Sequence, residues 1–186
     1  MTICNRCGEH KAKITMAWED GPESLCIDCY NHMLSVELGI EIENKVEELT
    51  VKDSEGIKRT FLIEQKLDPM GIFIRAEENV AYGYEFAVHG ELYCDQNELL
   101  QKLINKIKQG VGVSYIEERA FPNGQMYHSM VHNQLVGRVD SSGLHELPVI
   151  VVDGKPYTWE QIGKMMNTYE GFQFELKIRD LFDDID

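Results

Sequence analysis

The chain has 186 residues, which is long enough to bury a substantial hydrophobic core. Its 18 lysine and arginine residues face 32 aspartate and glutamate residues, so the formal net charge is −14 at pH 7. A chain this acidic repels phosphate backbones unless its basic residues gather on one face, and the composition therefore argues against bulk nucleic-acid binding. No apolar run approaches ~18 residues, so no membrane span is expected.

Two cysteine pairs dominate the N-terminal part of the chain. Cys4 and Cys7 are separated by two residues, as are Cys26 and Cys29, and eighteen residues lie between the pairs. Four thiolates bind Zn²⁺ well, and a two-residue gap lets both sulfurs of a pair reach one ion. Because four thiolates leave no ligand position open, we predict one structural Zn²⁺ rather than a catalytic one. The nearby histidines, His10 and His32, are expected to be exposed or to lie behind the ligands.

The elements around these cysteines predict a small zinc finger over residues 1–43. Residues 13–18 have the pattern of a short strand, residues 19–24 that of a turn, and residues 26–38 the apolar spacing of a helix that ends at Gly39. A knuckle, a hairpin and a helix in this order are typical of a treble-clef-like or ribbon finger.

A mostly polar stretch, residues 40–46, separates the finger from a second run of elements. Asp95 is expected to cap a helix that ends at Gly110, with Glu98 as its capping-box partner. The helix should lie across an antiparallel meander of four short strands, which the alternation of apolar residues places near residues 49–51, 59–65, 72–75 and 82–88.

The C-terminal part carries further strand signals. Strands are expected within 113–121, 135–139 and 147–152, whereas 125–133 is ambiguous between helix and strand. Asp153-Gly154 is a hairpin-turn dipeptide, and Thr158 is expected to cap a helix with Gln161 in the reciprocal position. The clearest alternation in the chain predicts a last strand, with Phe172, Phe174, Leu176 and Ile178 on one face and Gln173, Glu175, Lys177 and Arg179 on the other.

These patterns predict an α+β fold: a small zinc finger followed by an antiparallel-sheet domain with two main helices. The domain spans 46–180 and is divisible into 46–110 and 113–180, and residues 181–186 form an acidic tail that is expected to fray. Whether the strands make one sheet or two is left open.

One C-terminal block is distinctive: Val152-Asp153-Gly154-Lys155-Pro156-Tyr157-Thr158-Trp159-Glu160-Gln161-Ile162-Gly163-Lys164-Met165, followed by Tyr169-Glu170-Gly171-Phe172-Gln173-Phe174. It resembles a block in a family of uncharacterised bacterial proteins that pair an N-terminal CxxC/CxxC finger with an α+β domain. The resemblance spans the chain. It implies the architecture and the zinc, and it carries no catalytic residues.

Two further candidate sites lie in the C-terminal part. A pocket formed by His128, His132, Asp153 and Glu170 would suit an enzyme, although turn chemistry already explains Asp153 and no metalloprotease glutamate stands beside His128. A ligand groove is the second candidate, and a buried core is the alternative reading for its residues, which are Tyr157, Trp159, Tyr169 and Glu170. Cys94 is expected to be a buried, inert thiol.

Three functions remain open at this stage. The leading hypothesis is a protein-interaction or regulatory module with structural zinc and a basic protein partner, in the reducing cytoplasm that zinc thiolates and an unpaired Cys94 require. The first alternative is an enzyme of unrecognised class that uses the histidine-containing pocket. The second is nucleic-acid binding through the finger by Arg6, Lys11 and Lys13. Positions 1–43 contain eight acidic residues, which weakens the positive potential that such binding needs.

Overall fold

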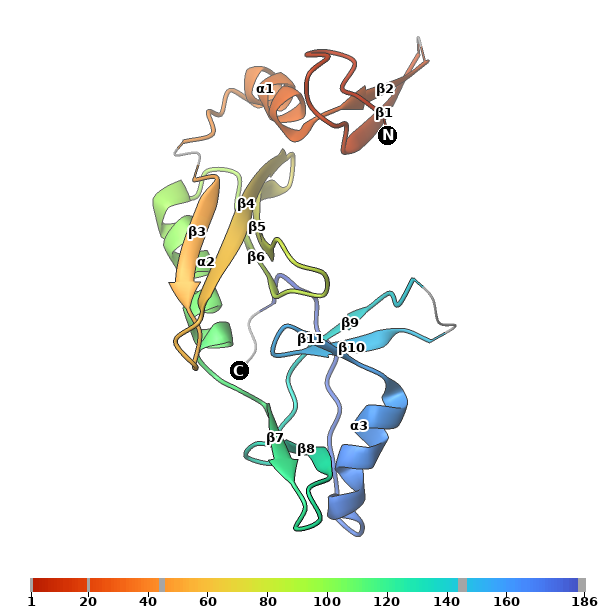
Figure 1. Cartoon of the computed structure of the whole chain (residues 1–186). Helices are drawn as coiled ribbons and strands as arrows, with labels where there is room; N and C mark the ends of the chain where they lie inside the picture. The colour runs from red at the N-terminus through yellow and green to blue at the C-terminus, as the bar shows by residue number, and fades with distance from the viewer. Residues whose placement is uncertain (1, 20, 44–45, 144–146, 184–186) are drawn as a thin grey trace.

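The computed structural model describes residues 2–19, 21–43, 46–143 and 147–183. Over these residues the fold is α+β and every strand pairing is antiparallel, as the sequence predicts. The molecule is elongated: the cysteine-containing unit lies at one end, a four-stranded sheet with α2 follows, and the C-terminal sheets with α3 lie at the other end (Figure 1).

The N-terminal unit consists of a hairpin, β1 (Ile14–Trp18) and β2 (Gly21–Leu25), followed by α1 (Ile27–Leu38). The helix ends as predicted, because Gly39 adopts a left-handed φ of 66° and donates its N–H to the Ser35 carbonyl. The predicted turn over 19–24 is too long, since Gly21–Leu25 pairs along its whole length with β1.

The middle of the chain forms the predicted meander. Its strands are β3 (Glu48–Lys52), β4 (Lys58–Asp68), β5 (Gly71–Glu78) and β6 (Glu85–Gly90), and they lie in the order β3-β4-β5-β6. The helix α2 (Gln96–Val111) packs across this sheet. Its buried side chains, Leu99, Leu103, Ile107 and Val111, join those of the sheet in one core.

Two predicted boundaries in this region are wrong. Tyr82 and Tyr84 lie before β6, and Tyr82 sits in a turn with a φ of 58°. Gly110 does not end α2, because the helix continues to a buried Val111 and is capped at Gly112. Gly110 instead lies against the Phe86 ring, where an added Cβ would come within 2.3 Å of a ring carbon. Its small size therefore serves packing rather than termination.

The N-terminal unit shares its core with the sheet. Leu25, Tyr30 and Leu34 belong to the same buried cluster as the sheet residues. Asn31 is buried on α1, and its amide donates to the Gln65 carbonyl (2.7 Å) and accepts from the Leu67 N–H (2.8 Å). The unit is therefore fixed to β4 by both packing and hydrogen bonds.

The C-terminal part builds two separate small sheets. One pairs β7 (Ile116–Ala120) with β8 (Met126–Met130), and the other has the order β11-β10-β9, formed by β9 (Arg138–Asp140), β10 (Val149–Val152) and β11 (Lys155–Tyr157). The ambiguous 125–133 segment is thus a strand followed by a turn. The helix α3 (Trp159–Met166) begins with the predicted capping box and is followed by the 3₁₀ turn η1 (Asn167–Tyr169). A second core lies here: Ile116, Val152, Tyr157, Ile162 and Met165.

The predicted last strand does not form. Residues 170–180, which we call the strap, contain no strand, and all of their side chains are exposed. In Figure 1 the strap runs from the end of α3 back toward the four-stranded sheet. An alternating pattern shows that a segment can pair in a sheet, but it does not supply a neighbouring strand.

The start of the acidic tail is held rather than frayed. The Lys106 ammonium on α2 donates to the carbonyls of Leu181 (3.0 Å) and Asp183 (2.6 Å), as well as to that of Ala87. The Phe182 ring meets the Phe73 ring edge-on, with centroids 5.2 Å apart. The rest of the predicted tail, 184–186, lies outside the described residues.

Candidate metal centre

The structure brings the four predicted cysteines together. One sulfur from each of Cys4, Cys7, Cys26 and Cys29 lies within 4.8 Å of the other three, and the Cys7 and Cys26 sulfurs are 3.9 Å apart. Cys4 and Cys26 are buried and the other two are half-buried. All five cysteines of the chain are free of disulfide bonds. This donor set fits a single tetrahedral ion, because thiolates are the ligands of closed zinc sites.

Local backbone structure positions each cysteine pair. The first pair sits in a knuckle in which the Gly8 N–H donates to the Cys4 carbonyl (3.0 Å). The second pair sits at the start of α1, where Cys26 is the N-cap residue and its sulfur accepts from the Cys29 N–H at 3.5 Å. A helix N-terminus carries partial positive charge that favours a thiolate, but burial outweighs this effect and raises the pKa of both Cys26 and Cys29.

The protein environment shifts the pKa values of Cys4 and Cys29 in opposite directions. Burial opposes ionisation of Cys4, but N–H groups of Cys26, Cys7 and Arg6 outweigh it and lower the Cys4 pKa to about 6. Burial and the neighbouring cysteines raise the pKa of Cys29 to about 12. Thiols this close cannot all ionise without a cation between them, so a bound divalent ion would remove the conflict.

His10 adds a nitrogen at the edge of the cluster. Its Nδ1 is 3.8 Å from the Cys7 sulfur, and its ligand atom lies within 4.8 Å of those of Cys26 and Asp28. It is exposed, which is one of the two predicted placements. His32 is also exposed, on α1.

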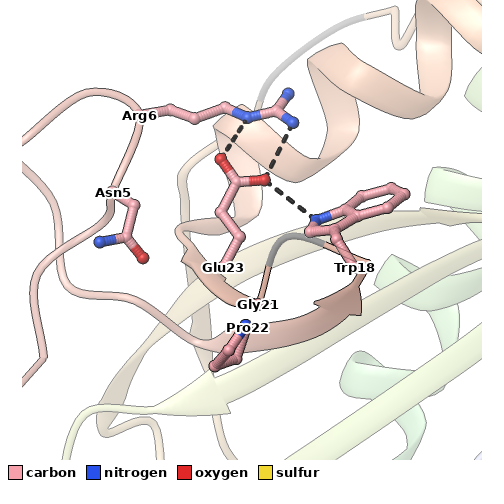
Figure 2. A pocket seen from close by; sticks show the side chains of 6 residues that line it. All are labelled: Asn5, Arg6, Trp18, Gly21, Pro22 and Glu23. Carbon is pink, nitrogen blue, oxygen red and sulfur yellow. Dashed lines mark hydrogen bonds and ion pairs between the residues drawn. The ribbon is translucent and has the colours of Figure 1, made fainter.

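A shallow hollow lies beside the metal centre (Figure 2). Arg6 donates to both oxygens of Glu23, at 2.9 and 3.1 Å, and the same carboxylate accepts from the Trp18 indole N–H at 3.2 Å. Arg6 thereby lowers the pKa of Glu23. Asn5, Gly21 and Pro22 complete the lining. Trp18 is 45 % exposed, so its ring presents an apolar surface next to a satisfied ion pair.

The four residues of the predicted enzyme pocket have separate local roles. His128 packs edge-on against the Tyr157 ring, with centroids 5.4 Å apart. His132 and Glu170 are exposed. None of these four residues contributes to the hollow beside Trp18 or to the smaller hollow between Glu43 and α2.

Asp153 has a structural role that the Asp153-Gly154 turn pattern does not predict. As predicted, Asp153 and Gly154 form the β10–β11 turn, with φ values of 52° and 69°. In addition, the Asp153 Oδ2 accepts from the N–H groups of Tyr115 (2.8 Å) and Ile116 (2.9 Å) and lies 3.3 Å from the Ser114 hydroxyl. The carboxylate therefore fixes the segment that leads from α2 into β7. Sequence offers no signal for this contact, because the partners are backbone groups nearly forty residues away.

The candidate groove residues divide between core and surface. Tyr157 is buried in the second core, whereas Trp159 is 46 % exposed at the start of α3, so the core reading is wrong for Trp159. Tyr169 is half-buried and donates its hydroxyl to Asn133 Oδ1 at 2.8 Å. Cys94 is half-buried as an isolated thiol, and burial together with Asp95 and Glu91 raises its pKa, which suits an inert role.

The fold and the cysteine cluster define an α+β protein whose N-terminal unit is compatible with a small zinc-binding ribbon. Three family models match the chain, each described as a domain of unknown function: DUF7685 over residues 3–41, DUF7686 over 43–112 and DUF7713 over 115–183. No curated protein and no solved structure matches it. None of the described helices is long and apolar enough to cross a membrane. The division into units at 1–43 and 46–180 stays a prediction.

Proposed function

We propose that this chain is a protein-binding module that uses a structural Zn²⁺ at Cys4, Cys7, Cys26 and Cys29 and engages a partner with a basic surface, in a reducing compartment such as the cytoplasm. The cysteine geometry supports the structural role, because four thiolates complete the coordination sphere and leave no position for a substrate. The ion would then hold the knuckle against α1, and the chemistry of the module would be recognition.

The observation that carries the proposal is an acidic strip between α1 and β3. It contains five exposed carboxylates within twelve positions: Glu37, Glu41, Glu43, Glu47 and Glu48. The strip crosses the junction between the zinc unit and the sheet, where Gln96 accepts from the Glu43 N–H (2.9 Å) and donates to the Glu41 carbonyl (2.8 Å). Exposed like charges within one stretch of chain attract a cationic partner and raise its association rate.

Nucleic-acid binding through the finger has less support. Arg6 is paired with Glu23, and Lys13 is paired with Glu64. Two of the three basic side chains that this hypothesis requires are thus partly neutralised by carboxylates, which reduces the positive potential available to a phosphate backbone.

The test compares capture of basic proteins by the full, zinc-loaded chain at low and high salt. Capture should fall at high salt and should also be lost in a variant with Glu37, Glu41, Glu43 and Glu47 changed to Gln. The matched control changes four exposed glutamates elsewhere, Glu55, Glu118, Glu160 and Glu170, to Gln and should retain capture. Equal losses in the two variants would show a net-charge effect and contradict a binding strip.

A further inference from the structure

The strap carries an apolar row that the described part of the molecule leaves uncovered. Alternate side chains are strongly exposed: Phe172 (72 %), Phe174 (77 %), Leu176 (70 %) and Ile178 (80 %). A row of exposed aromatic and branched side chains is typical of a surface that another chain covers.

Both ends of the strap are anchored to the body of the molecule. At its start, the Phe172 N–H donates to the Tyr169 carbonyl (2.9 Å), and Tyr169 is held by Asn133. Just beyond its end, Lys106 and the Phe182 ring hold the chain on α2 and β5. The extended segment between these anchors has lost much of its freedom already, so pairing costs less entropy than it would for a free tail.

The charges of the strap are complementary to those of a second, antiparallel copy. Glu175 and Lys177 lie on one face, 3.3 Å apart. When two straps pair antiparallel about Leu176, Glu175 lies opposite Lys177 on both sides, and Phe174 lies opposite Ile178. Centring the pair on Glu175 or on Lys177 instead places two like charges directly opposite each other, which is destabilising. A register in which one strap is shifted by one residue places apolar side chains opposite polar ones.

We propose that the strap is a dimerisation strand, which pairs edge to edge with the strap of a second copy in an antiparallel register centred on Leu176. The interface is isologous, with the two-fold axis passing between the two Leu176 residues. It pairs the two strap backbones and brings their apolar rows side by side. This surface is distinct from the acidic strip, so each proposal can be tested independently of the other.

Sedimentation equilibrium of the full, zinc-loaded chain tests the association. The wild type should be a dimer, and Leu176→Asp should be monomeric. Glu175→Lys should weaken association about tenfold, because two attractive pairs become repulsive, and adding Lys177→Glu should restore it. Glu170→Lys, an equal charge change just before the apolar row, is the control and should leave association intact. A monomeric wild type, or a double variant that is no tighter than Glu175→Lys, would overturn the proposal.

Disulfide formation tests the register. Residues directly opposite in an antiparallel pair have Cα atoms close enough for a disulfide bond, whereas residues two positions out of register do not. Leu176→Cys should therefore cross-link to its own copy in the second chain, and Glu175→Cys should not. Equal cross-linking of the two variants would contradict the Leu176-centred register. Hydrogen exchange protection of the strap amides in a monomer would show pairing within one chain and would also overturn the proposal.

Discussion

Leu67 donates its buried backbone N–H to the Asn31 side-chain oxygen at 2.8 Å, and this bond joins the N-terminal unit to the four-stranded sheet. The register of β3 with β4 ends at the Glu48–Leu62 pair, and one further backbone bond joins the Ile63 N–H to the Glu47 carbonyl (2.9 Å). Beyond that point the Asn31 amide takes the place of a neighbouring strand, since it also donates to the Gln65 carbonyl. One side chain thus satisfies a buried N–H and a partly buried carbonyl that would otherwise lack this partner.

Replacing Asn31 with Ala should lower the free energy of unfolding by about 2–4 kcal/mol, because the buried Leu67 N–H and the partly buried Gln65 carbonyl both lose their partner. The measurement is urea denaturation of the zinc-loaded protein. His32→Ala, one position along α1 and exposed, should change stability by no more than about 0.5 kcal/mol. Similar losses in the two variants would mean that the helix, rather than the amide, accounts for the effect.

Two helical glycines should respond in opposite ways to the same substitution. Gly110→Ala places a Cβ within 2.3 Å of the Phe86 ring and should destabilise the protein by about 1–3 kcal/mol. Gly163→Ala on α3 meets no atom within 4 Å and should be neutral or stabilise by up to about 1 kcal/mol. Thermal unfolding of both variants checks the pair. A neutral Gly110→Ala would contradict the close approach of α2 to β6.

The Asp53–Arg59 ion pair should make stability depend on pH in the acid range. Burial opposes ionisation of Asp53, but Arg59 at 2.9 Å and the N–H groups of Ile57 and Glu55 lower its pKa below the ordinary 3.8. A depressed folded-state pKa contributes stability that is present above about pH 4 and is lost as the pH falls through the folded-state value.

Asp53→Asn should therefore be less stable than the wild type near pH 6, by about 1–3 kcal/mol, and the difference should vanish in strong acid. Urea denaturation of both proteins at several pH values gives this difference. Any zinc lost as thiolates become protonated is lost by both proteins, so it cancels in the comparison. A difference that stays constant with pH would show that the pair is not linked to stability in this way.

Sequence was informative where a feature depends on local chemistry. The cysteine spacing, the Gly39 helix end and the Thr158–Gln161 capping box each involve residues that are close in the chain, and the structure contains all three. The Asp153-Gly154 turn belongs to the same group, since two adjacent positive φ values require residue types that tolerate them.

Features that depend on residues far apart in the chain cannot be predicted from local sequence patterns. The strap has the clearest strand pattern in the chain but no strand beside it among the described residues, because alternation records only the ability to pair. The sequence predicts a helix end at Gly110 because it does not show that Phe86 lies against this glycine. Gln96 likewise binds the backbone of the 41–43 segment, more than fifty residues away in the chain.

We propose that one Zn²⁺ at the four-cysteine cluster holds the N-terminal unit together. The most direct measurement is the zinc content of the purified full chain by elemental analysis, combined with a thiol assay after unfolding. We expect one zinc per chain, five free thiols and loss of the metal in Cys26→Ser, whereas Cys94→Ser should retain it. A purified chain without stoichiometric metal, or with disulfides among Cys4, Cys7, Cys26 and Cys29, would show that no such ion holds the unit.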